Sequence, residues 1–467
     1  MALLTTITQS PLNNQSKLWN PALSKVPVPP VNERLVIEPD LNAHRIVLHS
    51  YSDLHFTPES FSIEKNSDRT HFTDHLRNIV VSQINILNDE NQDFILVLNG
   101  DIFEIIESYI WEHEQLPIDQ SGKIINPAQT LKLFENILLS NMETFNELRR
   151  FLEESDRTKI VFVIGNHDNL LQVDDRLRIL LQHVLMPEAS DDLRNKKIQF
   201  TMSFRVPCMK LAGEHGQRFD KYDYSENNGI TKGDWLSYVK INVMKATIER
   251  IKELESEGLT KEESNELINE IKKLQFIRSA TAFPLYLFHV AERYALENKD
   301  RHKLAEKIKE AISSASDELA DRLKEVEVEL LPFPLKALPK SFIGTRAFQK
   351  AFISIVSFIY NKITHNNNSQ LIYAAEIAES ERDVNWVTMG HTHRAGHWFT
   401  NLRKGGKVDL LNSGTWIPLK EIRRNGWDIE IGETELSEAM VYFSRGLAGK
   451  NEVDAGVKTV SNMTYKV

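Results

Sequence analysis

The chain lacks several features that would place it in a special class of protein. It contains a single cysteine, Cys208, among 467 residues, so an intramolecular disulfide is excluded and a reducing compartment fits. No run of about 18 apolar residues occurs, so we expect no transmembrane segment. No Lys or Arg precedes Lys17, and the first residues lack a long apolar stretch, which argues against a secretory signal. Internal repeats and low-complexity segments are also missing, and we expect a cytoplasmic protein.

The composition is that of an ordinary globular protein. Hydrophobic residues make up 41% and charged residues 26% of the chain, which argues against wholesale disorder. Lys and Arg number 56 against 66 Asp and Glu, so the formal net charge is −10. A chain this acidic is not suited to coating nucleic acid non-specifically, although a local basic groove stays open. The length indicates about three domains, or one large domain with an insertion.

Alternating strand and helix patterns predict an α/β fold. Strands are expected at His44–Ser50, Phe94–Leu98 and Ile160–Ile164, and the last two are continuous apolar runs typical of strands that are buried on both faces. Helical spacing of apolar residues predicts helices near Thr73–Leu87 and over Leu131–Leu152, the second as one long amphipathic helix. Strand, helix, strand, helix, strand is the pattern of the α/β class.

The second half of the chain changes character. Further strands are expected at Lys197–Val206, Met209–Ala212, Val384–Thr388, Val408–Leu411 and Trp427–Ile431. Between them, Asp234 to about Val326 is charged and helical, with a capping box at Thr260 and Glu263. Three prolines in Leu331–Pro339 break this region.

We therefore divide the chain into four parts. Residues 1–42 form a loosely ordered N-terminal arm, and residues 43–221 the first part of an α/β core. Residues 222–383 form a mainly helical insertion, serving as a cap or as a partner-binding region, and residues 384–467 the second part of the core and a C-terminal tail. The apolar helix expected at 346–364 suits the interior of the insertion better than peripheral contact with a membrane, which stays the alternative. The oligomeric state is left open.

Five short segments contain residues that commonly bind metals, and each follows a predicted strand. They are Asp53-Leu54-His55, Gly100-Asp101-Ile102-Phe103-Glu104, Gly165-Asn166-His167-Asp168, Glu214-His215-Gly216 and Gly390-His391-Thr392-His393. Each segment alone is a weak signal, because a lone DxH or GD occurs by chance in many proteins. The ordered set is a strong signal, since ligands of open α/β sheets collect at the carboxyl ends of the strands.

In this order the motifs DxH, GDxxE, GNHD, His-Gly and GHTH resemble the signature of calcineurin-like metallophosphoesterases. The resemblance covers roughly residues 43–220 and 384–435. It implies a four-layer α/β/β/α sandwich in which two mixed sheets pack together and hold a dinuclear metal site at strand ends. The motif edges are most similar to those of UDP-2,3-diacylglucosamine hydrolase-like proteins, which cleave a pyrophosphate. Two residues depart from that branch, His167 in place of an arginine and Gln217 in place of an acidic residue.

The resemblance also implies a role for each matched residue. Asp101 would bridge two divalent ions. The ligands of the first ion would be Asp53, His55, Asp101 and His393, and those of the second Asp101, Asn166, His215 and His391. Mixed nitrogen and oxygen ligands favour manganese here, with iron, zinc, magnesium, cobalt or nickel as alternatives. A hydroxide bound by both ions would then attack phosphorus near neutral pH.

Three further residues are candidates for catalysis. His167 would face the scissile phosphate and assist the leaving group. Asp168 would orient that imidazole or an adjacent loop, and Arg394 would contact phosphate oxygens. Glu104 is expected to support the site rather than to bind metal.

The sequence thus predicts a dinuclear metal-dependent phosphohydrolase acting on a phosphorylated substrate, either small or lipid-linked. A nuclease or a protein phosphatase of the same chemistry is the alternative enzyme. A non-catalytic binding module on the same fold is the alternative of a different class, although none of the seven expected ligands is missing.

Overall fold

The computed structural model describes most of the chain. The residues described are 18–40, 42–58, 71–79, 91–106, 117–119, 121–220, 223–226, 229–276, 286–287, 289–291, 293–294, 303–304, 306–308, 310–311, 367–381, 383–416, 420–425, 428–433, 439–446 and 453–459. Its longer helices include α2 (Pro127–Ser140), α3 (Met142–Glu153), α5 (Asp175–Leu185), α7 (Lys232–Glu253), α8 (Lys261–Lys272) and α13 (Asn367–Ser380). Shorter helices are α4 (Asn169–Val173) and α6 (Asp191–Lys197), and residues 71–79 are helical as well.

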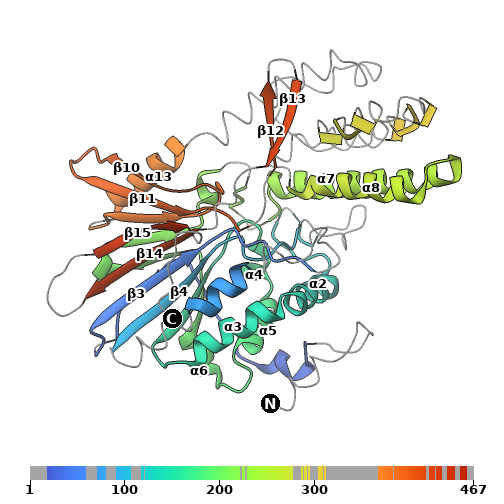
Figure 1. Cartoon of the computed structure of the whole chain (residues 1–467). Helices are drawn as coiled ribbons and strands as arrows, with labels where there is room; N and C mark the ends of the chain where they lie inside the picture. The colour runs from blue at the N-terminus through green and yellow to red at the C-terminus, as the bar shows by residue number, and fades with distance from the viewer. Residues whose placement is uncertain are drawn as a thin grey trace.

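Two mixed β-sheets form the centre of the fold (Figure 1). The seven-stranded sheet has the order β1 (Val31–Asn32), β6 (Ile198–Thr201), β5 (Thr158–Val163), β4 (Gln92–Asn99), β3 (Arg45–Tyr51), β14 (Ala439–Gly446) and β15 (Val453–Thr459). The six-stranded sheet has the order β10 (Ala395–Asn401), β11 (Lys407–Ser413), β9 (Trp386–Met389), β8 (Leu211–Glu214), β7 (Ser203–Val206) and β2 (Leu35–Val36). A separate hairpin pairs β12 (Lys420–Asn425) with β13 (Asp428–Glu433). The expected α/β class is confirmed.

Three apolar clusters hold these elements together. One contains side chains of both sheets, such as Leu48 and Val97 of the first and Leu211 and Leu411 of the second, so the two sheets pack face to face. The largest includes side chains of the seven-stranded sheet and of helices α2, α3 and α5, and it continues into α7 and α8. The third joins α13 to β9 and β11 of the six-stranded sheet through residues such as Ala374. The expected insertion of 222–383 thus contributes α13 to one of these clusters and α7 and α8 to another.

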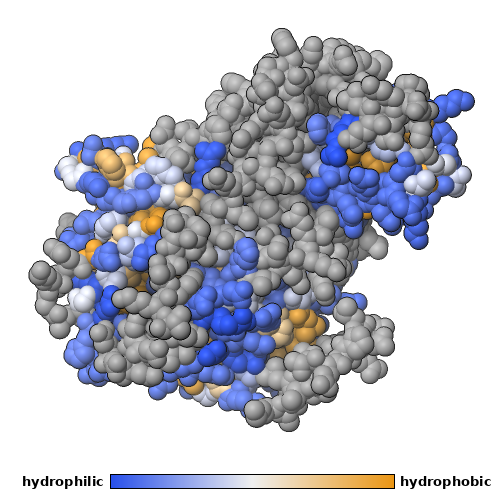
Figure 2. All heavy atoms as spheres, in the orientation of Figure 1, coloured by the Kyte–Doolittle hydropathy of each residue, from blue (hydrophilic) through white to orange (hydrophobic). Residues whose placement is uncertain are grey.

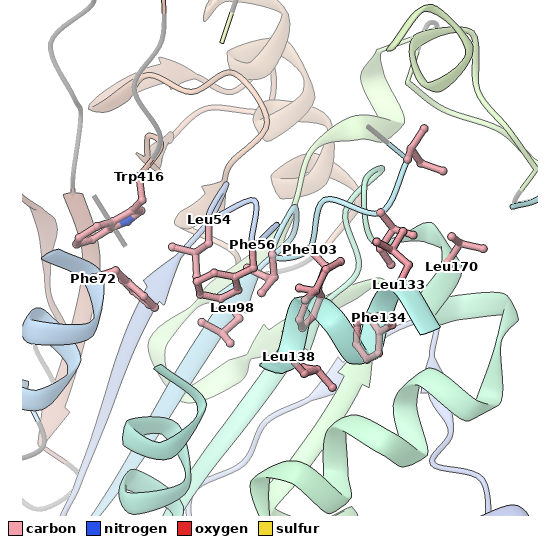
Figure 3. Packing of buried hydrophobic residues seen from close by; sticks show 14 of the residues in the cluster. Leu54, Phe56, Phe72, Leu98, Phe103, Leu133, Phe134, Leu138, Leu170 and Trp416 are labelled. Carbon is pink, nitrogen blue, oxygen red and sulfur yellow. The ribbon is translucent and has the colours of Figure 1, made fainter. Parts of the chain in front are cut away.

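The turns after β3 and β4 are anchored by apolar side chains that alternate with polar ones. Leu54 and Phe56 follow β3, Phe103 follows β4, and all three are almost completely buried (Figure 3). They contact a shared aromatic cluster, in which Phe56 and Phe103 lie 6.3 Å apart between ring centroids. Burial of a large side chain of this kind stabilises a fold by about 1.5–3 kcal/mol. The intervening polar residues are thereby directed to the opposite side of each turn.

Two expected elements are each divided in the structure. The single helix over Leu131–Leu152 is wrong, because α2 and α3 are separate helices that meet at Asn141. Its backbone leaves the helical region, and its side-chain amide donates to the carbonyls of Ile137 and Thr57. The single strand over Lys197–Val206 is also wrong, because β6 and β7 belong to different sheets. The chain crosses from one sheet to the other at Met202, whose amide donates to the Asn32 carbonyl.

The N-terminal arm differs from its expected loose order over the described residues 18–40. Strands β1 and β2 pair in parallel with β6 and β7, so the arm supplies an edge strand to each sheet. Its backbone groups are satisfied by the sheets, which the polar sequence of the arm does not indicate.

Helices α7 and α8 extend to one side of the sheets, and their visible surface is mostly hydrophilic (Figures 1 and 2). The capping box of Thr260 and Glu263 is confirmed at the start of α8. The expected helix at 346–364 and the proline-rich segment before it lie outside the described residues. Within the part of the chain that the structure describes, every helix is too short or too polar to cross a bilayer.

The buried His49 on β3 generates a prediction for stability in acid. Burial lowers the pKa of His49 from 6.5 to about 3, and its ring packs edge-on against Phe94. Between these two pH values the unfolded chain binds a proton that the folded chain does not, so stability falls as the pH is lowered through this window. His49→Gln should reduce this loss by up to about 1.4 kcal/mol per pH unit.

Urea midpoints measured at intervals between pH 7.5 and 5 would check this expectation. The matched control is His44→Gln, which changes an exposed histidine of the same segment. Parallel pH dependence of the wild type and His49→Gln would contradict it.

Candidate metal centre

The five metal-binding segments converge where strands of the two sheets end. Asp53 and Asp101 each lie two residues beyond their strands, β3 and β4, and Asn166 lies three beyond β5. These three strands are neighbours and run parallel in the seven-stranded sheet. His215 and His391 follow β8 and β9, which are parallel neighbours in the other sheet. The packed sheets therefore bring residues more than 300 positions apart to one edge.

The first group of facing ligand atoms consists of Asp53, His55, Asp101 and His393. The Nε2 atom of His393 lies 2.9 Å from Asp53 Oδ1. The Nε2 atom of His55 lies 4.0 Å from Asp53 Oδ1 and 4.0 Å from Asp101 Oδ2. All four residues are buried. This is the set that the sequence predicts for the first ion.

The second group contains Asp101, His215 and His391. The Nε2 atom of His215 lies 3.0 Å from Asp101 Oδ2, and Asn166 Oδ1 lies 3.2 Å from His391 Nδ1. With Asn166 these are the four residues that the sequence predicts for the second ion. Asp101 belongs to both groups, which is the arrangement required of a bridging carboxylate.

The chemistry of these atoms fits divalent ions. Asp53 Oδ1 and His215 Nε2 are buried and make no hydrogen bond in the described part of the protein, although each has a partner group about 3 Å away. Adjacent ligands at a right angle, each about 2.1 Å from one ion, are separated by about 3 Å. A buried group without a hydrogen bond costs free energy, and a cation shared by these atoms would remove that cost.

Three of the histidines have an acceptor at the ring nitrogen that faces away from the group. Nδ1 of His55 lies 3.0 Å from Glu104 Oε2, and Nδ1 of His215 lies 2.8 Å from the Asn99 carbonyl. Nε2 of His391 faces Asp220 and Asp223 at 3.5 and 3.6 Å. An acceptor at one nitrogen holds the proton there, which leaves the lone pair of the other nitrogen free for a metal.

The backbone is strained at the same residues. Among the described residues, seven that are not glycine have positive φ, and five of them are Asp53 (56°), His55 (45°), Asp101 (54°), His391 (68°) and His393 (57°). A positive φ is unfavourable for residues other than glycine, and such strain persists where the surrounding structure fixes it. The clustering of five cases at one site indicates that the positions of these side chains are maintained at a cost in stability.

The charges of the buried groups are mutually compensating. Burial alone would raise the pKa of Asp101, but the adjacent His215 and His167 rings outweigh burial and hold it well below its usual range. Burial alone would lower the pKa of His215, but the carboxylate of Asp101 raises it to about 9. The pKa of Asp53 is likewise lowered, because His393 outweighs the effect of burial. The negative charge of the two carboxylates is thus compensated by the histidines around them.

His167 adjoins the groups without belonging to either of them. Its Nδ1 lies 2.9 Å from Glu104 Oε1, and its Nε2 lies 4.0 Å from Asp101 Oδ2. Glu104 therefore contacts both His55 and His167. It lies between His55, an expected metal ligand, and His167, the candidate catalytic histidine.

The other two candidate catalytic residues, Asp168 and Arg394, differ in burial. The carboxylate of Asp168 accepts from the amides of Ile102 and Phe103 at 2.8 to 3.1 Å, so it orients the loop that follows β4 rather than the His167 ring. Burial and the charge of Asp101 raise the pKa of Asp168 to about 7. Arg394 is half-buried directly after His393.

Four residues of the site were not found from the sequence. Asp220 and Asp223 contact His391, whereas Gln370 and Asn412 donate to the Gly390 carbonyl at 3.0 and 2.8 Å. A signal was present for Asp220 and Asp223, which closely follow the His215-Gly216 motif, and for Asn412, which begins the segment Asn412-Ser413-Gly414 at the end of a predicted strand.

Comparison with known proteins adds nothing to this geometry. No protein-family model matches the chain, and no curated protein matches it. A function must therefore be inferred from the residues of the site.

Gly165 provides a steric test of the centre. A Cβ atom at this position would lie 2.3 Å from Asp101 Oδ1 and 2.4 Å from the Asp101 amide nitrogen. Gly165→Ala should displace the shared carboxylate and weaken Mn²⁺ binding by roughly tenfold or more, as measured by equilibrium dialysis. Gly446→Ala is the matched control, because no atom lies within 4 Å of its Cβ position. Equal Mn²⁺ affinity of the two variants would argue against a metal site at Asp101.

Proposed function

We propose that this protein is a dinuclear metal-dependent phosphohydrolase of the calcineurin-like metallophosphoesterase type. The observation that carries the proposal is the membership of Asp101 in both groups of facing ligand atoms. The two packed sheets, with helices on the outer face of each, are compatible with the four-layer α/β/β/α sandwich that this family would have. No expected ligand is displaced from the site, which favours an enzyme over a binding module that has lost turnover.

The proposed ligands form two sets, one for each ion, which share Asp101. Asp53, His55, Asp101 and His393 would hold the first ion, and Asp101, Asn166, His215 and His391 the second. Manganese is favoured, with iron, zinc, magnesium, cobalt or nickel as alternatives, because the ligands mix nitrogen and oxygen. When bound, such a pair of ions supplies Lewis acidity and a hydroxide nucleophile for attack on a phosphoester or pyrophosphate.

In the proposed mechanism His167 donates a proton to the leaving oxygen of the substrate. The Glu104 carboxylate can accept from Nδ1 of His167, and the acid that this proposal requires is the ring with a proton on Nε2 as well. Its other nitrogen, Nε2, then holds the proton to be donated and faces the side of Asp101 where the two groups meet. Glu104 is buried and contacts His55 as well, so the proton donor is fixed relative to the ligands of the first ion.

Negative charge near the proposed site argues against nucleic acid as the substrate. Asp220 and Asp223 lie beside His391 at the second position, and the formal net charge of the chain is −10. This surrounding does not suit the polyanionic backbone that a nuclease must bind. We therefore favour a small or lipid-linked phosphoester or pyrophosphate over nucleic acid.

Replacement of the shared carboxylate tests the proposed activity. Metal-stripped protein, supplied again with Mn²⁺, Mg²⁺, Zn²⁺ or Ni²⁺, should hydrolyse bis-p-nitrophenyl phosphate or p-nitrophenyl phosphate. Asp101→Asn should abolish this turnover, because an amide supplies no negative charge between two cations, while the circular dichroism spectrum stays that of the wild type. Turnover that survives Asp101→Asn would refute the dinuclear mechanism.

The pair of His167 and Glu104 gives a second test. His167→Gln should lower kcat by roughly 10²- to 10⁴-fold with KM and bound metal unchanged, since it removes only the proton donor. Glu104→Gln should lower kcat less, because one amide oxygen can still accept from one of the two rings. The double variant should be scarcely slower than His167→Gln if the two residues act as a unit. Independent, multiplicative losses in kcat would exclude that coupling.

A further inference from the structure

Both ends of the expected insertion reach one ligand, His391. Asp220 and Asp223 lie at the point where the chain leaves the core, just after the η4 turn (Gln217–Phe219). Gln370 lies in the first turn of α13, where the chain returns to the core. More than 140 residues separate the two ends in sequence, yet both contact the segment Gly390–His393 or its side chains.

The first end acts on the imidazole. Nδ1 of His391 lies 3.2 Å from Asn166 Oδ1, whereas Nε2 faces the carboxylates of Asp220 and Asp223. These carboxylates therefore favour the tautomer that carries the proton on Nε2 and presents the lone pair of Nδ1 to a metal.

The second end acts on the peptide that carries the imidazole. The side-chain amide of Gln370 donates to the Gly390 carbonyl at 3.0 Å, and Gln370 Oε1 lies 3.5 Å from Thr392 Oγ1. Gln370 is completely buried. Because the Gly390 carbonyl belongs to the peptide bond that precedes His391, this contact fixes a backbone that is already strained at a φ of 68°.

The ligands of the first metal position are held by contacts that differ from those of His391. His55 is held by Glu104, and its turn is anchored by Leu54 and Phe56 in the core. Asp53 is held by the amide of His391 and by its neighbour His393.

We propose that the two ends of the insertion are positioning elements for His391 and that they set the affinity of the second metal position. Asp220 and Asp223 orient the ring, and Gln370 orients its peptide. This inference rests on the proposed dinuclear centre and adds to it an unequal dependence of the two ions on the insertion.

Metal-binding measurements on the full chain test the proposal without relying on turnover. Equilibrium dialysis of metal-stripped protein against Mn²⁺ gives the number of ions and the affinity of each. The wild type should bind two ions per chain. His391→Ala provides the reference for loss of the second ion, and Glu226→Gln is the charge control, because Glu226 is exposed three residues beyond Asp223.

The first test variant is the double replacement Asp220→Ala/Asp223→Ala. The second is the isosteric Gln370→Glu, which replaces the amide that donates to the Gly390 carbonyl with a carboxylate that repels it. Both should bind the second ion roughly 10- to 100-fold more weakly, and the Asp220→Ala/Asp223→Ala variant should retain the first ion with wild-type affinity. Excess Mn²⁺ should restore two ions per chain, which a collapsed fold would not allow.

The proposal fails if either test variant binds the second ion within twofold of the wild type, or if both ions weaken equally in the Asp220→Ala/Asp223→Ala variant. Fewer than two ions on the saturated wild type would instead refute the dinuclear centre itself, and with it this inference. The two failures are therefore distinguishable in one experiment.

Discussion

The carboxylate of Asp101 is the group on which the rest of the structure depends. It lies at the one edge where strands β3, β4 and β5 of the first sheet end beside β8 and β9 of the second. A buried carboxylate is costly unless positive charge and hydrogen bonds compensate it. Here the compensation comes from the His167 amide on one oxygen and the His215 ring near the other. The packing of two sheets is what allows residues from both to serve the same anion.

The turns that carry the ligands combine strain with burial. Asp53, His55 and Asp101 adopt positive φ, and each such residue costs of order 1 kcal/mol or more. Their neighbours Leu54, Phe56 and Ile102 bury apolar side chains in the largest core cluster, which offsets that cost. A ligand and an anchor thus alternate along the same turn. The strain is tolerated because the anchors leave the turn no alternative conformation of comparable burial.

The sequence predicts those elements and site residues that leave a pattern in a short stretch of consecutive residues. Strands such as Phe94–Leu98 are visible because a strand buried on both faces is a continuous apolar run, and the ligands are visible because each follows such a run. The division at Asn141 depends on a side-chain contact with Thr57, and the crossing at Met202 depends on the partner strand β1, so neither could be seen in a local pattern. Gln370 was missed for the same reason, since a glutamine in a helix has no property that marks it as a partner of a distant carbonyl.

The unequal support of the two metal positions has a consequence for how specificity and activity are related. Coupling between two parts of a protein is reciprocal. If the insertion's ends orient His391, then an ion at the second position must in turn stabilise the arrangement of those ends through Asp220, Asp223 and Gln370. A substrate that contacts the insertion would then alter the affinity of the second ion, and the ion would alter the affinity for the substrate by the same factor. In the proposed enzyme, this linkage would let the region that selects the substrate also complete the site that cleaves it.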